Sequence, residues 1–188
     1  LQGRMPLADW GALGRDGRAV VLPPVGRWTA PGTLDGTRLD VHGVGTAGLG
    51  GHDTALIVAP AGGGHVALEV ETAALPQRQI EGIDRSLGLV EVTGKVDGGR
   101  EIGSVDWGAA VALGQLALGH ELVGASRRML DLAREHALDR VQFGQPIARF
   151  QAVRHRLAET LVAVEAADAV LEAAWVDQAP ESAAIGKA

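Results

Sequence analysis

One stretch near the middle of the chain decides the fold: residues 140–159 read Arg140-Val141-Gln142-Phe143-Gly144-Gln145-Pro146-Ile147-Ala148-Arg149-Phe150-Gln151-Ala152-Val153-Arg154-His155-Arg156-Leu157-Ala158-Glu159. Gly144 is predicted to end one helix, because glycine readily adopts a positive φ. Pro146 is predicted to start the next helix, since the first helical turn does not need the N–H that proline lacks. The stretch therefore predicts two helices that meet at a sharp corner.

The predicted corner carries a candidate binding site. It presents Arg140, Gln142 and Phe143 together, which are a cation, an amide and an aromatic ring. Such a set suits a phosphate group that lies beside a planar ring. A simpler alternative is that Arg140 caps a helix C-terminus, where the helix dipole favours a cation, and that Phe143 is a core residue.

The amino-acid composition argues against several classes of protein. The 188 residues are 46% hydrophobic, include no cysteine and carry a formal net charge of −6. A core can therefore form, disulfides are excluded, and the lack of a basic cluster argues against nucleic-acid binding. No apolar run is long enough to span a bilayer, the start shows no signal-peptide pattern, and the six His residues show no metal-ligand spacing. We therefore expect a cytoplasmic protein with no membrane span and no metal.

Residues 1–103 are predicted to form a β domain. They are rich in Gly, Pro, Val and Thr, with short apolar runs between turn signals. The clearest strands are residues 38–42, 53–59, 66–71 and 89–96, and Ala19 to Leu22 is a weaker candidate. Asp35-Gly36 and Gly62-Gly63-Gly64 are predicted hairpin loops, so neighbouring strands are expected to be antiparallel.

Residues 104–188 are predicted to form a helical domain. Apolar side chains recur there at intervals of three and four residues, first at Leu118, Leu122, Ala125, Met129, Leu132 and His136, then at Phe150, Val153, Leu157, Leu161, Val164, Ala167, Leu171 and Trp175. This pattern predicts two antiparallel helices of about 30 residues each, and a third helix beginning at Glu181. Helices of this length indicate a bundle or an oligomer core.

The corner closely resembles that of the acyl-CoA dehydrogenase family. The family typically reads Arg-x-x-Phe-Gly-x-x-Ile there, then Phe-Gln and His-x-Leu-Ala. This chain matches at Arg140, Phe143, Gly144, Ile147, Phe150, Gln151, His155, Leu157 and Ala158. The resemblance implies that Arg140, Gln142 and Phe143 reach across a subunit interface to the diphosphate and adenine side of an FAD that a neighbouring chain mainly holds.

Weaker matches extend the resemblance into the β half, at residues 32–39, 68–70 and 82–92. The implied fold is α+β: an antiparallel β-barrel or sandwich like the family's middle domain, followed by the first helices of its C-terminal four-helix bundle. Family members also have helices before and after these segments, so the resemblance suggests a fragment or a chain with missing parts.

The activity that the resemblance implies is FAD-dependent α,β-dehydrogenation of an acyl-CoA thioester, an oxidation of a CH–CH group in fatty acid or steroid catabolism. The implied partners are the acyl-CoA substrate, electron-transfer flavoprotein as acceptor, and further subunits in a homo-oligomer or hetero-oligomer.

The chain departs from the family at positions that matter for catalysis. Residues 23–26, Pro-Pro-Val-Gly, stand where family members carry a Thr-Glu-Pro-Gly-x-Gly-Ser-Asp loop against the thioester and flavin. Ala47 and Leu49 correspond to an aromatic residue and a Thr or Ser beside the isoalloxazine ring. A hydroxyl donor to the flavin is therefore lost, unless Thr46 replaces it.

The catalytic base is also missing from its expected place. Family members carry a Glu either late in the C-terminal domain, beyond Ala188, or on the first long helix, where this chain has Gly114. Glu121 is a candidate substitute, although it also suits an ordinary polar face of the helix. The alternative function is therefore a non-catalytic subunit that completes the FAD site of a catalytic partner. An unrelated helical scaffold without a cofactor is a third possibility.

Two arginine pairs on the helices have a plainer interpretation. Arg127-Arg128 and Arg154 with Arg156 are expected on solvated helix faces or in ion pairs between subunits, although one of them could meet the phosphates of CoA.

Overall fold

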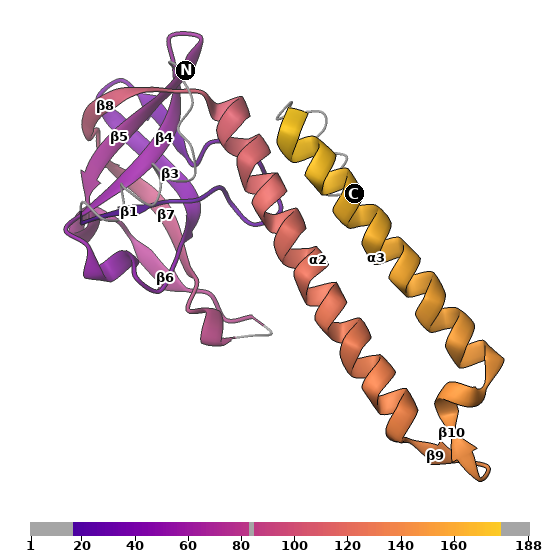
Figure 1. Ribbon diagram of the computed structural model, residues 1–188. Helices are drawn as coiled ribbons and strands as arrows, with labels where there is room; N and C mark the ends of the chain where they lie inside the picture. The colour runs from indigo at the N-terminus through magenta and orange to yellow at the C-terminus, as the bar shows by residue number, and fades with distance from the viewer. Residues whose placement is uncertain (1–16, 83–84, 178–188) are drawn as a thin grey trace. The chain divides into compact units, whose positions relative to one another are not determined.

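The computed structural model describes residues 17–82 and 85–177 (Figure 1). Two compact units make up the chain, Leu1–Ala110 and Val111–Ala188. The predicted third helix, from Glu181, lies outside the described residues. The α+β class is confirmed, because a β unit precedes two long helices.

Two four-stranded sheets build the β unit. The first has the order β1-β4-β5-β8 and the second the order β2-β3-β7-β6. Their bounds are β1 Arg18–Val20, β2 Gly32–Asp35, β3 Arg38–Gly45, β4 Thr54–Ala61, β5 Gly64–Glu71, β6 Gln77–Gln79, β7 Val90–Asp97 and β8 Arg100–Val105. Short 3-10 helices lie at η1 Leu49–Gly51, η2 Thr72–Ala74 and η3 Arg85–Leu87. The predicted strands are therefore all present, and β2, β6 and β8 are additional.

The expectation of antiparallel neighbours is wrong for one pair. β1 runs parallel to β4, with Arg18 opposite Thr54, whereas the other paired strands of the two sheets are antiparallel. The chain leaves β1, forms β2 and β3 in the other sheet, and only then returns as β4. No tight hairpin joins β1 to β4, so nothing in the connection requires them to be antiparallel.

Both predicted hairpin loops form. Asp35 pairs with Arg38 around a two-residue loop that begins with Gly36 at φ 60°. Ala61 pairs with Gly64 around Gly62 and Gly63, whose φ values are 57° and 80°. Turns with positive φ match the right-handed twist of the flanking strands, and glycine adopts them without steric cost.

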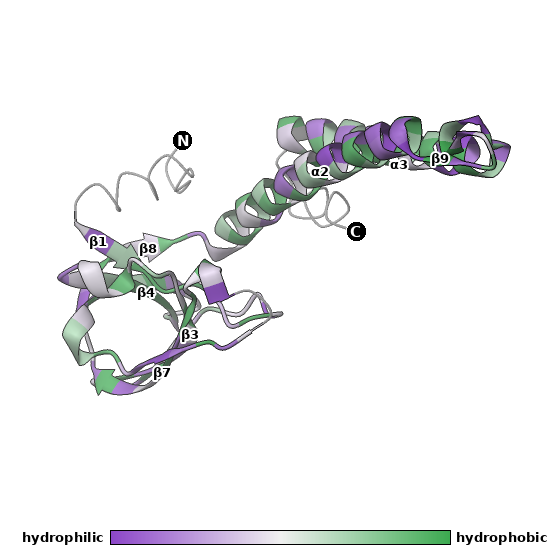
Figure 2. Cartoon of the chain, turned by 90° about the horizontal axis from the view of Figure 1, so that it is seen from below, coloured by the Kyte–Doolittle hydropathy of each residue, from purple (hydrophilic) through white to green (hydrophobic). Residues whose placement is uncertain are grey.

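The core of the β unit is apolar. It contains Val21, Leu39, Val41, Leu49, Ala55, Ile57, Ala59, Leu68, Val70, Leu75, Val92 and Val96, each at most 8% exposed. Strand β3 shows how a strand contributes to this core, since its residues from Arg38 to Val41 alternate between exposed and buried, and the buried ones, Leu39 and Val41, are apolar. In Figure 2 the strands of this unit curl around one another, with hydrophobic and hydrophilic residues interspersed along them.

The helical unit consists mainly of α2, Trp107–Asp139, and α3, Gln151–Asp177. The Asp106 carboxylate accepts a hydrogen bond of 3.0 Å from the Ala109 N–H and so caps the start of α2. Leu116 and Val123 of α2 share a buried cluster with Val164 and Leu171 of α3. The two long helices predicted from the sequence are confirmed.

The predicted apolar stripe of α2 does not face α3. Leu118, Leu122, Met129 and Leu132 are 39 to 62% exposed, whereas Ala112 and Leu116 are buried. The buried face also includes Gly119, and such small residues let two helix backbones approach closely. On α3 the predicted positions Val164, Ala167 and Leu171 do pack against α2. The α2 helix therefore has two apolar faces, and α3 covers only one of them.

Candidate functional site

The corner between the helices is a β-hairpin rather than a helix cap followed directly by a new helix. α2 ends at Asp139, and β9 (Val141–Gln142) pairs with β10 (Gln145–Pro146). A short 3-10 helix, η4 (Ile147–Arg149), leads into α3. The prediction that Gly144 ends the helix is therefore wrong. Gly144 is the second turn residue and has φ 77°. A type I′ turn and a helix C-cap both require a positive φ, which glycine adopts readily, so the same residue suits either structure.

Phe143 occupies the first turn position with an unusual backbone conformation and a highly exposed side chain. Its φ is 52°, and it is the one non-glycine residue with positive φ in the described part of the chain. Its side chain is 92% exposed and meets the Phe150 ring edge to face, with 6.2 Å between centroids. The alternative that Phe143 is a core residue does not hold for this chain. An exposed aromatic ring in a strained backbone conformation is typical of a binding residue.

Arg140 and Gln142 flank this ring on the same hairpin. Both are exposed, and Ile147 N–H donates to the Arg140 carbonyl at 2.8 Å, which closes the base of the hairpin. Within residues 17–82 and 85–177 the Arg140 guanidinium has no ion pair. The Gln142 amide donates only to the neighbouring Val141 carbonyl, at 2.8 Å. A cation, an amide and an aromatic ring thus lie exposed on one hairpin.

These three side chains could hold an anionic cofactor that carries a ring. A guanidinium makes charge-assisted bonds to phosphate oxygens, and an exposed aromatic face can stack on a heterocycle. Because all three side chains are exposed, a group bound there would also be free to contact another molecule.

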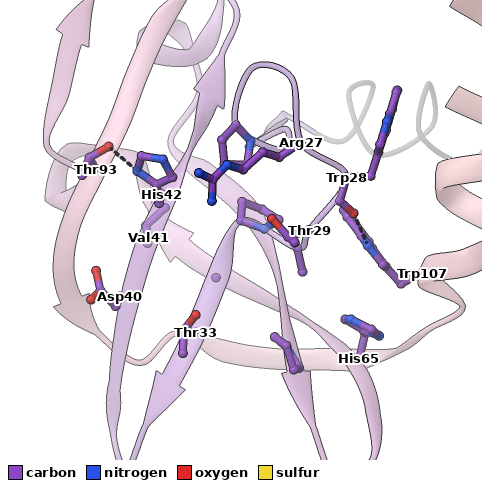
Figure 3. A pocket seen from close by; sticks show the side chains of 15 residues that line it. Arg27, Trp28, Thr29, Thr33, Asp40, Val41, His42, His65, Thr93 and Trp107 are labelled. Atoms are coloured by element: carbon purple, nitrogen blue, oxygen red, sulfur yellow. Dashed lines mark hydrogen bonds between the residues drawn. The ribbon is translucent and has the colours of Figure 1, made fainter. Parts of the chain in front are cut away.

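The segment that replaces the acidic loop forms a tight turn. Arg27 N–H donates to the Pro24 carbonyl at 3.0 Å, and Gly26 between them has φ 75°. The turn borders a pocket of about 710 Å³ in the β unit, which also includes His42 and Trp107 (Figure 3). Sequence reasoning did not find this pocket, because its residues are scattered along the chain and no linear motif connects them.

The positions that the resemblance predicts beside the flavin divide between core and surface. Leu49 is 1% exposed and belongs to the β core, so its side chain cannot lie beside a cofactor. Ala47 and Thr46 are exposed. Of the predicted positions, only these two present a side chain outward.

The position on α2 where the resemblance predicts the base offers space but no acid. Gly114 is exposed, and a Cβ added to it would meet nothing within 4 Å. Glu121 is exposed two turns further along the helix, as an ordinary polar position would be. The geometry therefore gives no support to Glu121 as a base.

Arg127 holds the two helices together. Its guanidinium donates to Glu165 at 2.7 Å and to Asp168 at 2.7 Å, both on α3, and these hydrogen bonds raise the pKa of Arg127. The expectation of a solvated face or an intersubunit pair is thus wrong for Arg127, because its partners lie on the same chain. Arg156 pairs only within α3, with Glu159 at 3.3 Å.

A second charged cluster joins three strands of the first sheet. The Glu69 carboxylate of β5 pairs with Arg18 of β1 at 2.7 Å and accepts a hydrogen bond from Arg100 Nε of β8 at 3.0 Å. The hydrogen bond from Arg100 is the main cause that lowers the pKa of Glu69. This cluster links the two edge strands, β1 and β8, to the interior strand β5, and its three charged groups pair with one another.

Two kinds of site are absent from the described residues. No three His, Asp or Glu side chains there are placed to hold a metal ion. Neither α2 nor α3 has a stretch apolar enough to cross a membrane.

Comparison with curated proteins identifies similar sequences. The chain is 38% identical over 97 residues to acyl-CoA dehydrogenase IpdE2 of Mycolicibacterium smegmatis, covering 47% of this chain and 31% of that protein. It is 39% identical over 95 residues to acyl-CoA dehydrogenase FadE27 of Mycobacterium tuberculosis, covering 48% of this chain and 25% of the relative. The chain thus spans about a third or less of the length of these relatives.

Solved structures with the same fold cover nearly the whole chain. The ChsE4-ChsE5 complex from Mycobacterium tuberculosis matches with a TM-score of 0.68 and 26% identity, over 95% of this chain and 53% of that one. The Tcur3481-Tcur3483 steroid ACAD has a TM-score of 0.71 at 22% identity, over 90% of this chain and 51% of the other, which shows the fold alone.

The helical half has its own match, since residues 108–186 fit the acyl-CoA dehydrogenase C-terminal domain family. That segment includes α2, the hairpin and α3, and the structural matches add the β unit in the same order. The chain therefore belongs to the acyl-CoA dehydrogenase family.

Proposed function

We propose that this chain takes part in FAD-dependent α,β-dehydrogenation of an acyl-CoA thioester, as an oxidoreductase acting on a CH–CH group. The observation that carries the proposal is the exposed hairpin with Arg140, Gln142 and Phe143, on a chain of this family. When bound, the flavin would accept the hydride that leaves the β-carbon of the substrate. Arg140 would bind the diphosphate, Gln142 would donate a hydrogen bond beside it, and Phe143 would lie against a ring of the cofactor.

We further propose that the chain acts within an oligomer. The side chains of Arg140, Gln142 and Phe143 are exposed, so they are available to a flavin that another subunit mainly holds. The uncovered face of α2, with Leu122 at 52% and Met129 at 62% exposure, offers an apolar contact for such a subunit. The solved ChsE4-ChsE5 assembly, a complex of similar fold, supports this arrangement. Electron-transfer flavoprotein is the proposed acceptor, and a steroid or fatty acyl group the proposed substrate portion.

A second candidate is that the chain is a non-catalytic subunit. It is favoured by Gly114, which stands at the helical base position and cannot remove an α-proton. In this version Arg140, Gln142 and Phe143 complete the FAD site of a partner subunit that supplies the carboxylate.

Flavin retention tests the role of the hairpin. Arg140→Ala removes a charge-assisted contact of about 1.5 to 3 kcal/mol and should weaken FAD binding by the assembled protein about ten- to a hundredfold. Arg156→Ala, an exposed arginine on α3 with a partner on its own helix, is the matched control and should leave FAD binding unchanged. Equal flavin content in both variants, with unchanged circular dichroism, would mean that Arg140 does not bind the flavin and has only a structural role.

A gain-of-function variant separates the two candidates. Gly114→Glu should fit, because space is open there, and Gly124→Glu is its control at an equally open glycine of the same helix. If the chain is catalytically inactive only because this acid is missing, Gly114→Glu should allow anaerobic bleaching of bound flavin by an acyl-CoA, while Gly124→Glu should not. Bleaching by the unchanged chain without a partner would show that its base lies elsewhere.

A further inference from the structure

A second pocket of the β unit lies where strands β4 and β5 end. Thr54 begins β4 and pairs with Glu71, the last residue of β5, and the 3-10 helix η2 follows directly. The pocket has a volume of about 480 Å³ and is lined by Gly50, His52, Asp53, Thr54, Glu71, Thr72, Ala73 and Gln77. None of these residues belongs to the proposed flavin contact.

Thr72 is the one buried residue of this lining. It is 4% exposed, and its hydroxyl is the one buried side-chain group in the described part of the chain that has no hydrogen-bond partner. Its backbone is fully engaged, because its N–H donates to the Asp53 carbonyl at 2.9 Å and its carbonyl accepts from the Leu75 N–H at 3.1 Å. A buried hydroxyl without a partner is costly and therefore rare in native proteins. The hydroxyl thus marks a place for a polar group from outside the chain.

The two carboxylates of the lining are also without partners. Asp53 and Glu71 are exposed, and neither forms an ion pair within residues 17–82 and 85–177. The lining contains no Lys or Arg, so these two acids give it a formal charge of −2 when His52 is neutral. A negative pocket of acceptor oxygens favours a cation that donates hydrogen bonds.

An organic cation fits this pocket better than a metal ion. Metal ions need several ligand atoms within about 2.0 to 2.6 Å, and no three acidic or His side chains among the described residues are placed to provide them. Ammonium and guanidinium groups instead donate over about 2.7 to 2.9 Å, and their N–H groups point in several directions, so they can reach acceptors that lie further apart.

We propose that this pocket binds an organic cation with N–H donors, a primary ammonium or a guanidinium, which donates to the Asp53 and Glu71 carboxylates and to the Thr72 hydroxyl oxygen. A free amine and a basic side chain of another protein share this chemistry. The site lies in the β unit, whereas the Arg140 hairpin lies in the helical unit, and its ligand does not depend on the proposed function.

An NMR titration of the purified, ¹⁵N-labelled 188-residue chain with agmatine tests the proposal. Agmatine carries both a guanidinium and an ammonium, and it should shift the amide signals of residues 50–54 and 71–77 in a saturable way. Tetramethylammonium is a cation without N–H donors and should bind about tenfold more weakly or less. Asp53→Asn should weaken agmatine binding about tenfold. Glu101→Gln is the matched control, because Glu101 is an exposed acid of β8 outside the pocket.

The buried hydroxyl has its own pair of variants. Thr72→Val removes the hydroxyl and nearly keeps the shape, so it should weaken agmatine binding about five- to tenfold. The same change should leave the thermal midpoint of the ligand-free chain unchanged or higher, because it removes an unpaired buried polar group. Thr72→Ser keeps the hydroxyl and should retain most of the affinity. A lower midpoint with unchanged binding in Thr72→Val would mean that the residue serves only the fold.

A second probe distinguishes the two sources of the cation. N-acetylarginine amide represents an arginine side chain on a partner protein, whereas agmatine represents a free amine. Equal binding of the two probes would point to a partner's side chain. Tighter binding of agmatine would point to a small free cation with two charged ends. Both results support the proposed chemistry.

Four results would overturn the inference: no saturable shift with agmatine, equal binding of tetramethylammonium, equal losses in Asp53→Asn and Glu101→Gln, or saturation by Ca²⁺ at a lower concentration than agmatine. The last result would assign the pocket to a metal ion instead. None of these measurements involves flavin, so the role of Arg140 is tested separately.

Discussion

The two units of this chain differ in how completely they bury their own apolar side chains. In the β unit Leu39, Ile57 and Val92 are fully buried between two sheets. In the helical unit Leu122, Met129 and Leu132 remain 47 to 62% exposed. Two helices can bury only the stripes that face each other, whereas two curled sheets enclose a core. The β unit therefore encloses an apolar core of its own, and the helices have apolar surface left for further contacts.

The largest effect should come from the β core. Ile57→Ala removes a fully buried side chain and should lower the free energy of unfolding by about 3 to 4 kcal/mol, since a cavity adds to the lost burial. Urea unfolding followed by circular dichroism measures this change. Leu122→Ala on the exposed helix face should change stability by less than about 0.5 kcal/mol. Similar losses in both variants would contradict the contrast between the units.

The exposed face of α2 should matter for assembly instead. Changing both Leu122 and Leu132 to Ser should weaken association of the subunits by about 2 to 3 kcal/mol, about a hundredfold, if that face is covered by another subunit. Sedimentation equilibrium gives the dissociation constant. Leu138→Ser is the control, because Leu138 is 52% exposed on the same helix but outside the stripe. A wild-type chain that stays monomeric at micromolar concentration would remove the basis for this prediction.

The hairpin should show a trade between stability and binding. Phe143→Asn should stabilise the helical unit by about 1 kcal/mol, because asparagine tolerates the observed φ of 52° better than an aromatic residue. The same variant should retain less FAD in the assembled protein. Thermal unfolding and flavin absorbance measure the two effects on one sample. Loss of stability with unchanged flavin content would mean that the ring serves the fold.

The smallest effect concerns the charged cluster of the first sheet. The pKa of Glu69 is lowered in the folded chain, chiefly by the hydrogen bond from Arg100. Its contribution to stability is therefore fully present above the unfolded value of about 4.3 and is lost as the pH falls through the lower folded value. Glu69→Gln should cost about 1 kcal/mol or less at pH 7 and almost nothing in strong acid, by urea unfolding at each pH. A cost that grows toward low pH would contradict this assignment.

Much of the helical half could be predicted from local patterns. The intervals of three and four residues predicted both long helices, and Gly144 with Pro146 marked the break between them. The face of α2 that packs on α3 could not be predicted, because Leu118 and Leu116 are equally apolar and only the partner helix distinguishes them. The hairpin was missed for a similar reason, since a positive φ at Gly144 fits both a helix cap and a tight turn.

The sequence by itself determined what its local chemistry requires: strands where short apolar runs lie between turn signals, hairpins at Asp35-Gly36 and Gly62-Gly63, and two long helices with Arg140, Gln142 and Phe143 at the break between them. Only the tertiary structure decided the parallel pairing of β1 with β4, the partners of Arg127, and the pocket that brings Arg27, His42 and Trp107 together. Periodicity and turn propensity act between near neighbours in the chain. Contacts between distant segments depend instead on how two surfaces fit, which no single segment contains.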